Sequence, residues 1–188
     1  MMQVENYIVK PETMALFPMN GPYGERWTIV IETTQIIVVP QLHTEIIDRS
    51  CAEFGTSYEG GKSGTIALMG YKTMTPICLC AELGMYFLPL SSPENHYCIW
   101  LSHTHIKDWK QKDKESITVR FINYQVIDLP ISKNAFDLKV FRTAQYRHRI
   151  QETVAEYRVV REPMTDRNVV DLNKSVIKME DGGYRLRE

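Results

Sequence analysis

The sequence lacks a long hydrophobic run, a strong net charge and a cysteine framework. No apolar stretch approaches the roughly 18 residues of a membrane-spanning helix, so no membrane partner is expected. The net charge is −1, which excludes a uniformly basic nucleic-acid coat protein. The N-terminus has no basic segment followed by an apolar one, so we expect no signal peptide. The four cysteines then indicate reduced thiols in a cytoplasm.

Recognisable patterns for catalysis and for metal binding are also scarce. Nothing in the spacing of the five histidines and four cysteines identifies a nucleophile and its base. Cys51 fits a small core residue better than a nucleophile. Pairs that could ligate a metal exist, but none has the C-x2-C spacing of a structural zinc site: Cys78 with Cys80, His96 with Cys98, and His103 with His105. We therefore expect no catalytic residue, no metal and no cofactor.

One glycine-rich stretch, FGTSYEGGKSGT at 54–65, invites comparison with a phosphate-binding loop. Such a loop needs a glycine, four residues and then Gly-Lys-Ser. Gly61, Lys62 and Ser63 fit, but Thr56 occupies the position that the first glycine should have. One extra residue in the loop changes the direction of the backbone N–H groups that bind phosphate. We interpret 54–65 as a glycine-rich turn between a helix and a strand. A basic loop that lets the backbone approach some other phosphate chain stays open.

The charge that the sequence has is unevenly distributed. Residues 101–150 contain 10 Lys and Arg against 5 Asp and Glu, a local charge of +5. The other 138 residues contain 12 against 18, a local charge of −6. A basic region on a nearly neutral protein indicates one face for a polyanion, with an ordinary solvated surface as the alternative.

The pattern of apolar residues predicts an α+β fold. Its N-terminal two-thirds is mostly antiparallel β and could close into a small barrel, and a C-terminal helical segment follows. A short helix is expected at 44–54, and a hairpin around Asn123. The expected strands are 6–10, 13–18, 27–34, 35–40, 65–70, 76–80, 85–90, 97–109, 116–121 and 125–131.

The pattern changes to helical spacing at Ser132, a good N-cap. We expect one long helix or two shorter ones over 133–160, ended by Pro163. Residues 1–162 would form a single domain, and 163–188 a loosely ordered tail with an amphipathic turn or two at 168–179.

Two stripes of cations could follow a phosphate backbone. On a strand over 97–109, His103, His105 and Lys107 would share one side and lead into Lys110 and its neighbours. On the helix, four residues would project within about 80° of one another: Lys139, Arg142, Tyr146 and Arg149. A solvated helix face beside a core face is the alternative.

Three segments resemble the competence transcription factor family, ComK: IIDRSCAEFGTSYEGGKSGT (46–65), IWLSHTHIKDWK (99–110) and LPISKNAFDLKVFRTAQ (129–145). The resemblance implies a sequence-specific DNA-binding activator of DNA-uptake genes from a Gram-positive bacterium. Family members bind paired A/T-rich boxes mainly through the minor groove, as dimers that pair on the site. A homodimer pairing to a tetramer on double-stranded DNA, in the cytoplasm at the nucleoid, is therefore expected.

The resemblance supplies no roles for single residues, so we chose DNA-proximal candidates by charge within the matching segments. A minor groove reader needs a few well-placed cations and no high overall pI. The candidates are Arg49, Lys62, His103, His105, Lys107, Lys110, Arg120 and Arg142, of which Arg120 lies between two of the segments. Arg49, between Asp48 and Ser50, could equally make an internal ion pair.

The C-terminal region departs from the family pattern. In family members this region contributes to activation. An aromatic-rich stretch in it binds an adaptor that delivers the protein to a Clp protease. Residues 161–176 contain no aromatic residue, and Tyr184 is the first to follow. A paralogue of the same fold that regulates through protein–protein contacts and has lost DNA binding is the main alternative, and a metal-dependent or thiol enzyme is the third hypothesis.

Overall fold

The computed structural model describes residues 2–159, 176–180 and 184–186. They belong to two compact units, Met1–Gln151 and Glu152–Glu188. In the second unit, strands β11 (Val176–Lys178) and β12 (Tyr184–Leu186) pair antiparallel. The amphipathic turn expected at 168–179 lies largely outside the described residues, and its end at 176–178 is a strand instead. The predicted boundary at 162 stays a prediction.

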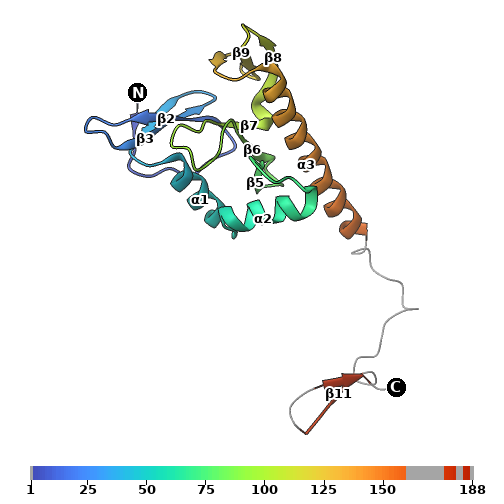
Figure 1. Ribbon diagram of the computed structural model, residues 1–188. Helices are drawn as coiled ribbons and strands as arrows, with labels where there is room; N and C mark the ends of the chain where they lie inside the picture. The colour runs from blue at the N-terminus through green and yellow to red at the C-terminus, as the bar shows by residue number, and fades with distance from the viewer. Residues whose placement is uncertain (1, 160–175, 181–183, 187–188) are drawn as a thin grey trace. The chain divides into compact units, whose positions relative to one another are not determined.

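The first unit is built on a seven-stranded sheet (Figure 1) with the order β1-β4-β3-β2-β7-β6-β5. All neighbours pair antiparallel except β1 with β4. The sheet is open, with β1 and β5 at its edges, so the barrel does not form. The strands are β1 (Met2–Gln3), β2 (Thr13–Asn20), β3 (Arg26–Glu32), β4 (Ile36–Val39), β5 (Ile77–Cys80), β6 (Met85–Pro89) and β7 (Trp100–Ser102).

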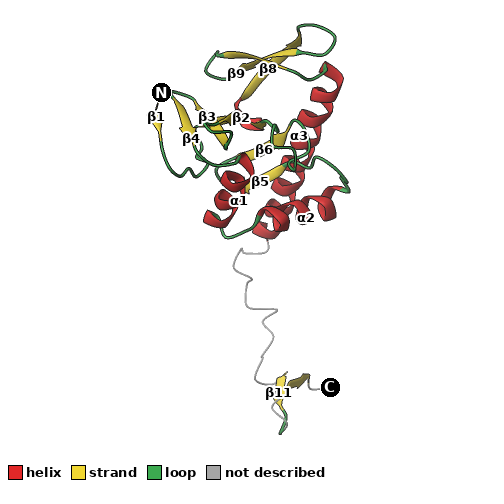
Figure 2. Ribbon diagram, turned by 60° about the vertical axis from the view of Figure 1, so that its left-hand side comes forward, coloured by secondary structure: helices red, strands yellow, loops and turns green. Residues whose placement is uncertain are grey.

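A second sheet and three helices complete the unit (Figure 2). The sheet has three antiparallel strands in the order β10-β9-β8: β8 (Ile106–Gln111), β9 (Ile117–Phe121) and β10 (Val126–Leu129). The helices are α1 (His43–Glu53), α2 (Tyr58–Met69) and α3 (Lys133–Val159). No helix among the described residues is both long and apolar enough to cross a bilayer.

Two hydrophobic cores lie on opposite faces of the large sheet. Successive strand residues point to opposite faces, and Phe87 and Trp100 belong to one core while Leu88 and Leu101 belong to the other. The first core receives Ile46, Ile47 and Cys51 of α1. The second receives Phe136 and Val140 of α3 and the inner side of the three-stranded sheet. The small sheet and α3 are thus held on one face of the large sheet.

The predicted fold class is confirmed, as are the hairpin around Asn123 and the helix that begins after Ser132. The backbone N–H of Phe136 donates to the Ser132 carbonyl at 3.0 Å, and the N–H of Ala135 donates to Oγ of Ser132 at 3.4 Å. The helix is a single element of 27 residues. The predicted short helix at 44–54 is α1.

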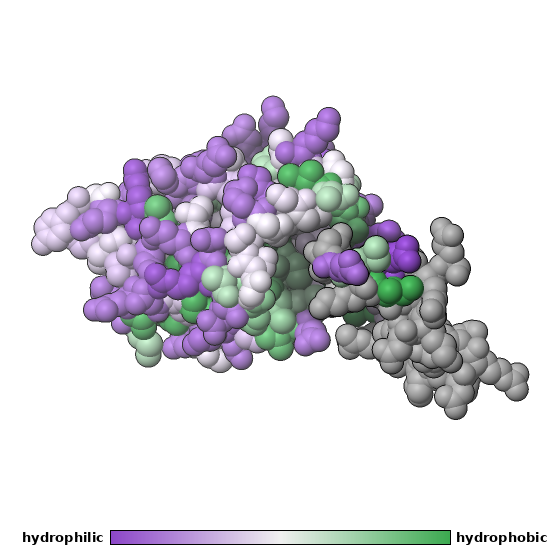
Figure 3. Space-filling view, turned by 90° about the horizontal axis from the view of Figure 1, so that it is seen from below, coloured by the Kyte–Doolittle hydropathy of each residue, from purple (hydrophilic) through white to green (hydrophobic). Residues whose placement is uncertain are grey.

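The predictions of a turn at 54–65 and a strand at 65–70 are wrong, because most of this stretch is helix α2. Oγ of Ser57 caps it by accepting from the N–H of Gly60 at 3.0 Å. Gly61 has a packing role, since a Cβ there would lie 3.3 Å from the side chain of Ile77. Gly61 therefore lets α2 pack close to β5. Viewed from below (Figure 3), the unit shows mostly hydrophilic side chains with small hydrophobic patches between them.

Two further strand predictions are wrong. Residues 6–10 run unpaired along the fold, where the N–H of Val9 donates to Oγ of Ser50 at 2.9 Å. The segment 97–109 is divided into β7, a 3-10 turn at His103–His105, and β8. His103, His105 and Lys107 therefore do not form one row on one side of a strand.

Candidate nucleic-acid interface

The outer side of the β8–β9–β10 sheet carries two of the predicted cations that reach solvent, Lys110 and Arg120. The register places Asp108 opposite Arg120 and Lys110 opposite Thr118, with Val126 and Asp128 completing the two rows on β10. The alternating residues of the same strands are buried in the second core. We call the six named residues the outer face. It encloses a shallow depression of about 280 Å³.

The two carboxylates of this outer face, Asp108 and Asp128, each hold a cation. Nε of Arg120 donates to both carboxylate oxygens of Asp108, at 3.1 and 3.0 Å, and a terminal guanidinium N–H adds a third bond. These hydrogen bonds hold the pKa of Asp108 below its usual value. Lys112 pairs with Asp128 in the same way and lowers its pKa. Surface pairs of this kind are worth little to stability, so the cations are fixed in position without being essential to the fold.

Two other predicted cations lie over tyrosine rings. Nζ of Lys107 is 3.9 Å from the ring centroid of Tyr124, a residue that is 69% exposed. The guanidinium of Arg142 is 5.1 Å from the ring of Tyr71, whose hydroxyl donates to Gln145 at 3.0 Å. Cation–π contact orients a cation while its charge stays available to a partner in solvent. Lys107 and Arg142 are therefore oriented cations on β8 and α3.

The two histidines are placed differently from the other candidates. His105 is buried, and its Nδ1 hydrogen bonds with Oγ of Ser102 at 2.8 Å. His103 is half-buried, and no described residue hydrogen bonds to its buried Nδ1. Burial lowers the pKa of both imidazoles. They are neutral groups at neutral pH, and His105 faces the protein interior.

The basic stripe expected on α3 does not form as one surface. Tyr146 is 5% exposed and packs edge-on against Tyr86, with 6.1 Å between ring centroids. The ammonium of Lys139 donates to the Pro89 carbonyl at 3.0 Å, and burial lowers its pKa. Both side chains therefore serve packing, and Arg142 is the member of the stripe whose charge lies over an aromatic ring near the surface.

Arg49 and Lys62 lie on α1 and α2. Arg49 is exposed and donates to the side-chain oxygen of Asn6, so its partner is a neutral amide and not an internal carboxylate. Nζ of Lys62 is 3.6 Å from Glu59 and 5.9 Å from the ring of Tyr58. Lys62 lines a pocket of about 490 Å³ together with a second lysine and two glutamates, Lys72, Glu59 and Glu94. That pocket has balanced charges.

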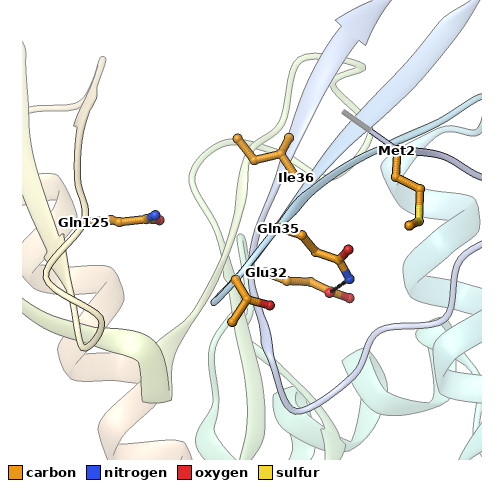
Figure 4. Close-up of a pocket in the computed structure, with 6 residues that line it drawn as sticks. Met2, Glu32, Gln35, Ile36 and Gln125 are labelled. Atoms are coloured by element: carbon orange, nitrogen blue, oxygen red, sulfur yellow. Dashed lines mark hydrogen bonds between the residues drawn. The ribbon is translucent and has the colours of Figure 1, made fainter.

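Another pocket, of about 560 Å³, lies beside the turn that joins β3 to β4. Figure 4 shows Gln125 on one side of it and Glu32, Gln35 and Ile36 on the other, with Nε2 of Gln35 donating to Glu32 at 2.6 Å. None of the described residues that line it is a lysine or an arginine. It is therefore not a site for a polyanion.

The described residues hold no group of three or more side chains that could bind a metal ion. Their cysteines are all free thiols. Burial raises the pKa of Cys51 to about 12 and that of Cys78 to about 11. A thiol that stays protonated is a poor nucleophile, so neither cysteine is prepared for catalysis.

Two residues that bear on the placement of surface cations were not predicted from the sequence. Asp108 was not singled out, although its position opposite Arg120 fixes that cation. Arg26 was also missed: its guanidinium lies 5.1 Å from the ring of Tyr97 and donates to the Tyr97 hydroxyl at 3.0 Å. The only sequence signal for Arg26 is its place just after the turn NGPYGE.

The fold and the site together define an α+β protein whose candidate site is a set of oriented surface cations. The family model described as ComK protein matches residues 4–155. The chain is also 33% identical over 151 residues to the Competence transcription factor of Bacillus subtilis (strain 168), which covers 80% of this chain and 78% of that protein. The chain therefore belongs to the ComK family. The matches support a transcription regulator of the competence type. No solved structure matches this chain.

Proposed function

We propose that this protein is a sequence-specific DNA-binding activator of competence genes that reads A/T-rich boxes largely through the minor groove. The observation that carries the proposal is the family match, which spans nearly the whole first unit, residues 4–155. The oriented cations of β8, β9 and α3 lie within that match. A narrow A/T-rich minor groove has an enhanced negative potential that attracts arginine and lysine.

The eight candidate DNA-binding residues differ in how far they present charge at the surface. Lys107, Lys110, Arg120 and Arg142 present charge at the surface of the first unit, and we place them in first contact with phosphates or groove edges. Arg49 and Lys62 lie on the helices and would reach phosphates if the DNA extends over them. His103 and His105 are neutral and partly or fully buried, so their part in binding would be to support the turn before β8.

The expected assembly follows the family. We propose a homodimer that pairs to a tetramer on double-stranded DNA, in the cytoplasm at the nucleoid. An adaptor to a Clp protease would bind the C-terminal region. Because 161–176 lacks aromatic residues, we propose that this contact uses other side chains than in the rest of the family.

The test is fluorescence anisotropy of a labelled duplex with two A/T-rich boxes against a G/C-rich duplex of equal length. Titrations at several salt concentrations and with a minor-groove-binding dye complete it. We expect tighter A/T binding that the dye displaces and that weakens steeply with salt, because phosphate neutralisation releases counterions. Equal weak binding to both duplexes would contradict the proposal.

One observation favours the alternative of a protein–protein regulatory paralogue. Leu138 and Phe141 on α3 are 51% and 59% exposed, which is high for large apolar side chains on a helix. A partner that covers them would need no DNA. Self-association in sedimentation equilibrium, combined with no shift of either duplex, would support this alternative.

A further inference from the structure

The hairpin of β2 and β3 projects beyond the strands on either side of it. Their pairing continues to Asn20 opposite Arg26. On one side, β4 pairs with β3 only from Thr28 to Ile31. On the other, β7 pairs with β2 only at Ala15 and Leu16. The end of the hairpin is therefore a two-stranded ribbon, which Figure 1 shows leaving the sheet at the left.

The turn at the end of this ribbon is closed by backbone hydrogen bonds. The N–H of Gly21 donates to the Glu25 carbonyl at 2.8 Å, and the N–H of Gly24 donates to the Gly21 carbonyl at 3.2 Å. Gly24 has a φ of +86°, a conformation that glycine adopts without strain. A Cβ on Gly21 would lie 2.6 Å from Nε1 of Trp27, so the indole packs directly on the turn.

The chemistry of the turn is apolar at its outermost point and cationic at its base. Tyr23 is 92% exposed, and its neighbour Pro22 is exposed as well. The carboxylate of Glu25 accepts the N–H of Tyr23 at 2.9 Å and stays exposed at the side of the turn. Arg26 stands behind, oriented by Asn20 and by the ring of Tyr97.

We propose that this turn inserts into the minor groove of an A/T-rich box, with the ring of Tyr23 as a wedge against a base step and Arg26 toward the groove wall. The inference rests on the proposed function. A minor groove about 6 Å wide admits a single turn but no helix. Proteins that bind this groove use apolar wedges beside cations. A turn with no exposed cation at its outermost point is unsuited to phosphates and suited to base faces.

The hydrogen-bonded turn is already in one conformation before it binds DNA. Such a preorganised contact loses little conformational freedom on binding. The same exposed ring on a mobile loop would be ordered at a cost to affinity. The Tyr23 ring is 92% exposed and contributes nothing to the core, so it is free to contact a partner.

The experiment compares the full-length chain with Tyr23→Ala, Tyr23→Phe and the control Tyr157→Ala. Tyr157 is 71% exposed and lies outside residues 4–155. The probe is the two-box A/T-rich duplex with 2-aminopurine in each box. Anisotropy gives the Kd, and 2-aminopurine fluorescence reports base unstacking.

We expect Tyr23→Ala to weaken binding about 10- to 100-fold, the range that loss of one base–aromatic contact gives. It should also abolish a fluorescence rise that the wild type shows at saturation. Tyr23→Phe should keep both, since the ring is the wedge, and Tyr157→Ala should match the wild type. Melting temperatures should be equal, because the Tyr23 side chain is outside the core.

Three results would overturn the inference, each in a distinct way. If the wild type binds neither an A/T-rich nor a G/C-rich duplex, the proposed function fails and this inference fails with it. If the wild type binds and Tyr23→Ala behaves identically, the wedge alone is wrong. If Tyr23→Ala instead loses self-association in sedimentation equilibrium without DNA, the turn is a contact for a second copy of the chain.

Discussion

The two sheets of the first unit use polar side chains in different ways. In the large sheet they are buried and bound to segments that pack on it: the Glu32 carboxylate of β3 accepts from the Tyr7 hydroxyl at 2.6 Å, and the indole N–H of Trp100 of β7 donates to Nδ1 of His43 in α1 at 3.2 Å. On the outer face of the small sheet they are exposed, as in the pair of Arg120 with Asp108. The first set stabilises the fold, and the second is available to a partner.

The reason for the difference is the environment of each group. A buried polar atom that loses its partner cannot turn to water. An exposed ion pair exchanges each partner for water at little cost. We therefore expect substitutions in the large sheet to act on stability, and substitutions on the outer face to act on DNA binding.

The largest effect is expected from Glu32→Ala in the large sheet. Glu32 is 5% exposed and accepts from Tyr7 and from Gln35. Its loss leaves the buried Tyr7 hydroxyl with Oγ1 of Thr13 as its remaining partner, and the free energy of unfolding should fall by about 2 kcal/mol, the loss of a hydrogen bond to a charged group. Urea denaturation measures this. Glu12→Ala, on the exposed side of the same region, is the control and should change stability little.

The pH dependence of stability should come next in size. Burial lowers the pKa of His43, His103 and His105 from the ordinary value of 6.5. Below pH 6.5 the unfolded chain binds more protons than the folded one, so stability is full above that pH and falls as the pH decreases. Urea midpoints at pH 7.5 and 5.5 should differ, and His105→Gln should reduce the difference. A flat profile would show that the imidazoles are not buried.

On β8 and α3, Lys107→Ala and Arg142→Ala should each weaken binding to an A/T-rich duplex about tenfold at moderate salt. The melting temperature should stay the same, because both cations lie over exposed or half-exposed rings. Lys10→Ala is a matched control, since Lys10 also lies over a tyrosine, 5.7 Å from the Tyr7 ring, but outside the basic region. Unchanged affinity in both variants would remove these residues from the interface.

The smallest effect is expected from Asp108→Asn. It tests directly whether the polar groups of the two sheets differ in their contribution to stability. The change frees Arg120 and removes a negative charge from the outer face. Affinity for both duplexes should rise a fewfold, with reduced preference for A/T, and the melting temperature should not change. A clear loss of stability would show that the pair belongs with the buried networks of the large sheet.

The sequence predicted the elements whose local signals agree with the tertiary packing. The hairpin around Asn123 and the helix after Ser132 have both turn or cap chemistry and apolar periodicity. Helix α2 was missed because Gly60, Gly61 and Gly64 have low helix propensity. Close packing of Gly61 on Ile77 and the cap at Ser57 override that propensity.

The site was harder to predict than the fold, because charge in a sequence does not show which way a side chain faces. His105 and Tyr146 have the same local patterns as Lys107 and Arg142, yet both are buried. The 3-10 turn at His103–His105 interrupts the alternation on which the predicted row depended. The pairing of Asp108 with Arg120 is a register effect between two strands, and no local pattern shows it.

The most direct test of the account measures binding and stability on one variant, Lys107→Gln with Lys110→Gln and Arg120→Gln. Each phosphate contact contributes about 0.9 to the slope of log affinity against log salt concentration. We predict that the slope for the A/T-rich duplex decreases by about 2.7, three contacts at that value, while the urea midpoint stays at the wild-type value. An unchanged slope would contradict the claim that the outer face, together with Lys107, is the DNA-binding surface. A large fall in the urea midpoint would contradict the division between the two sheets.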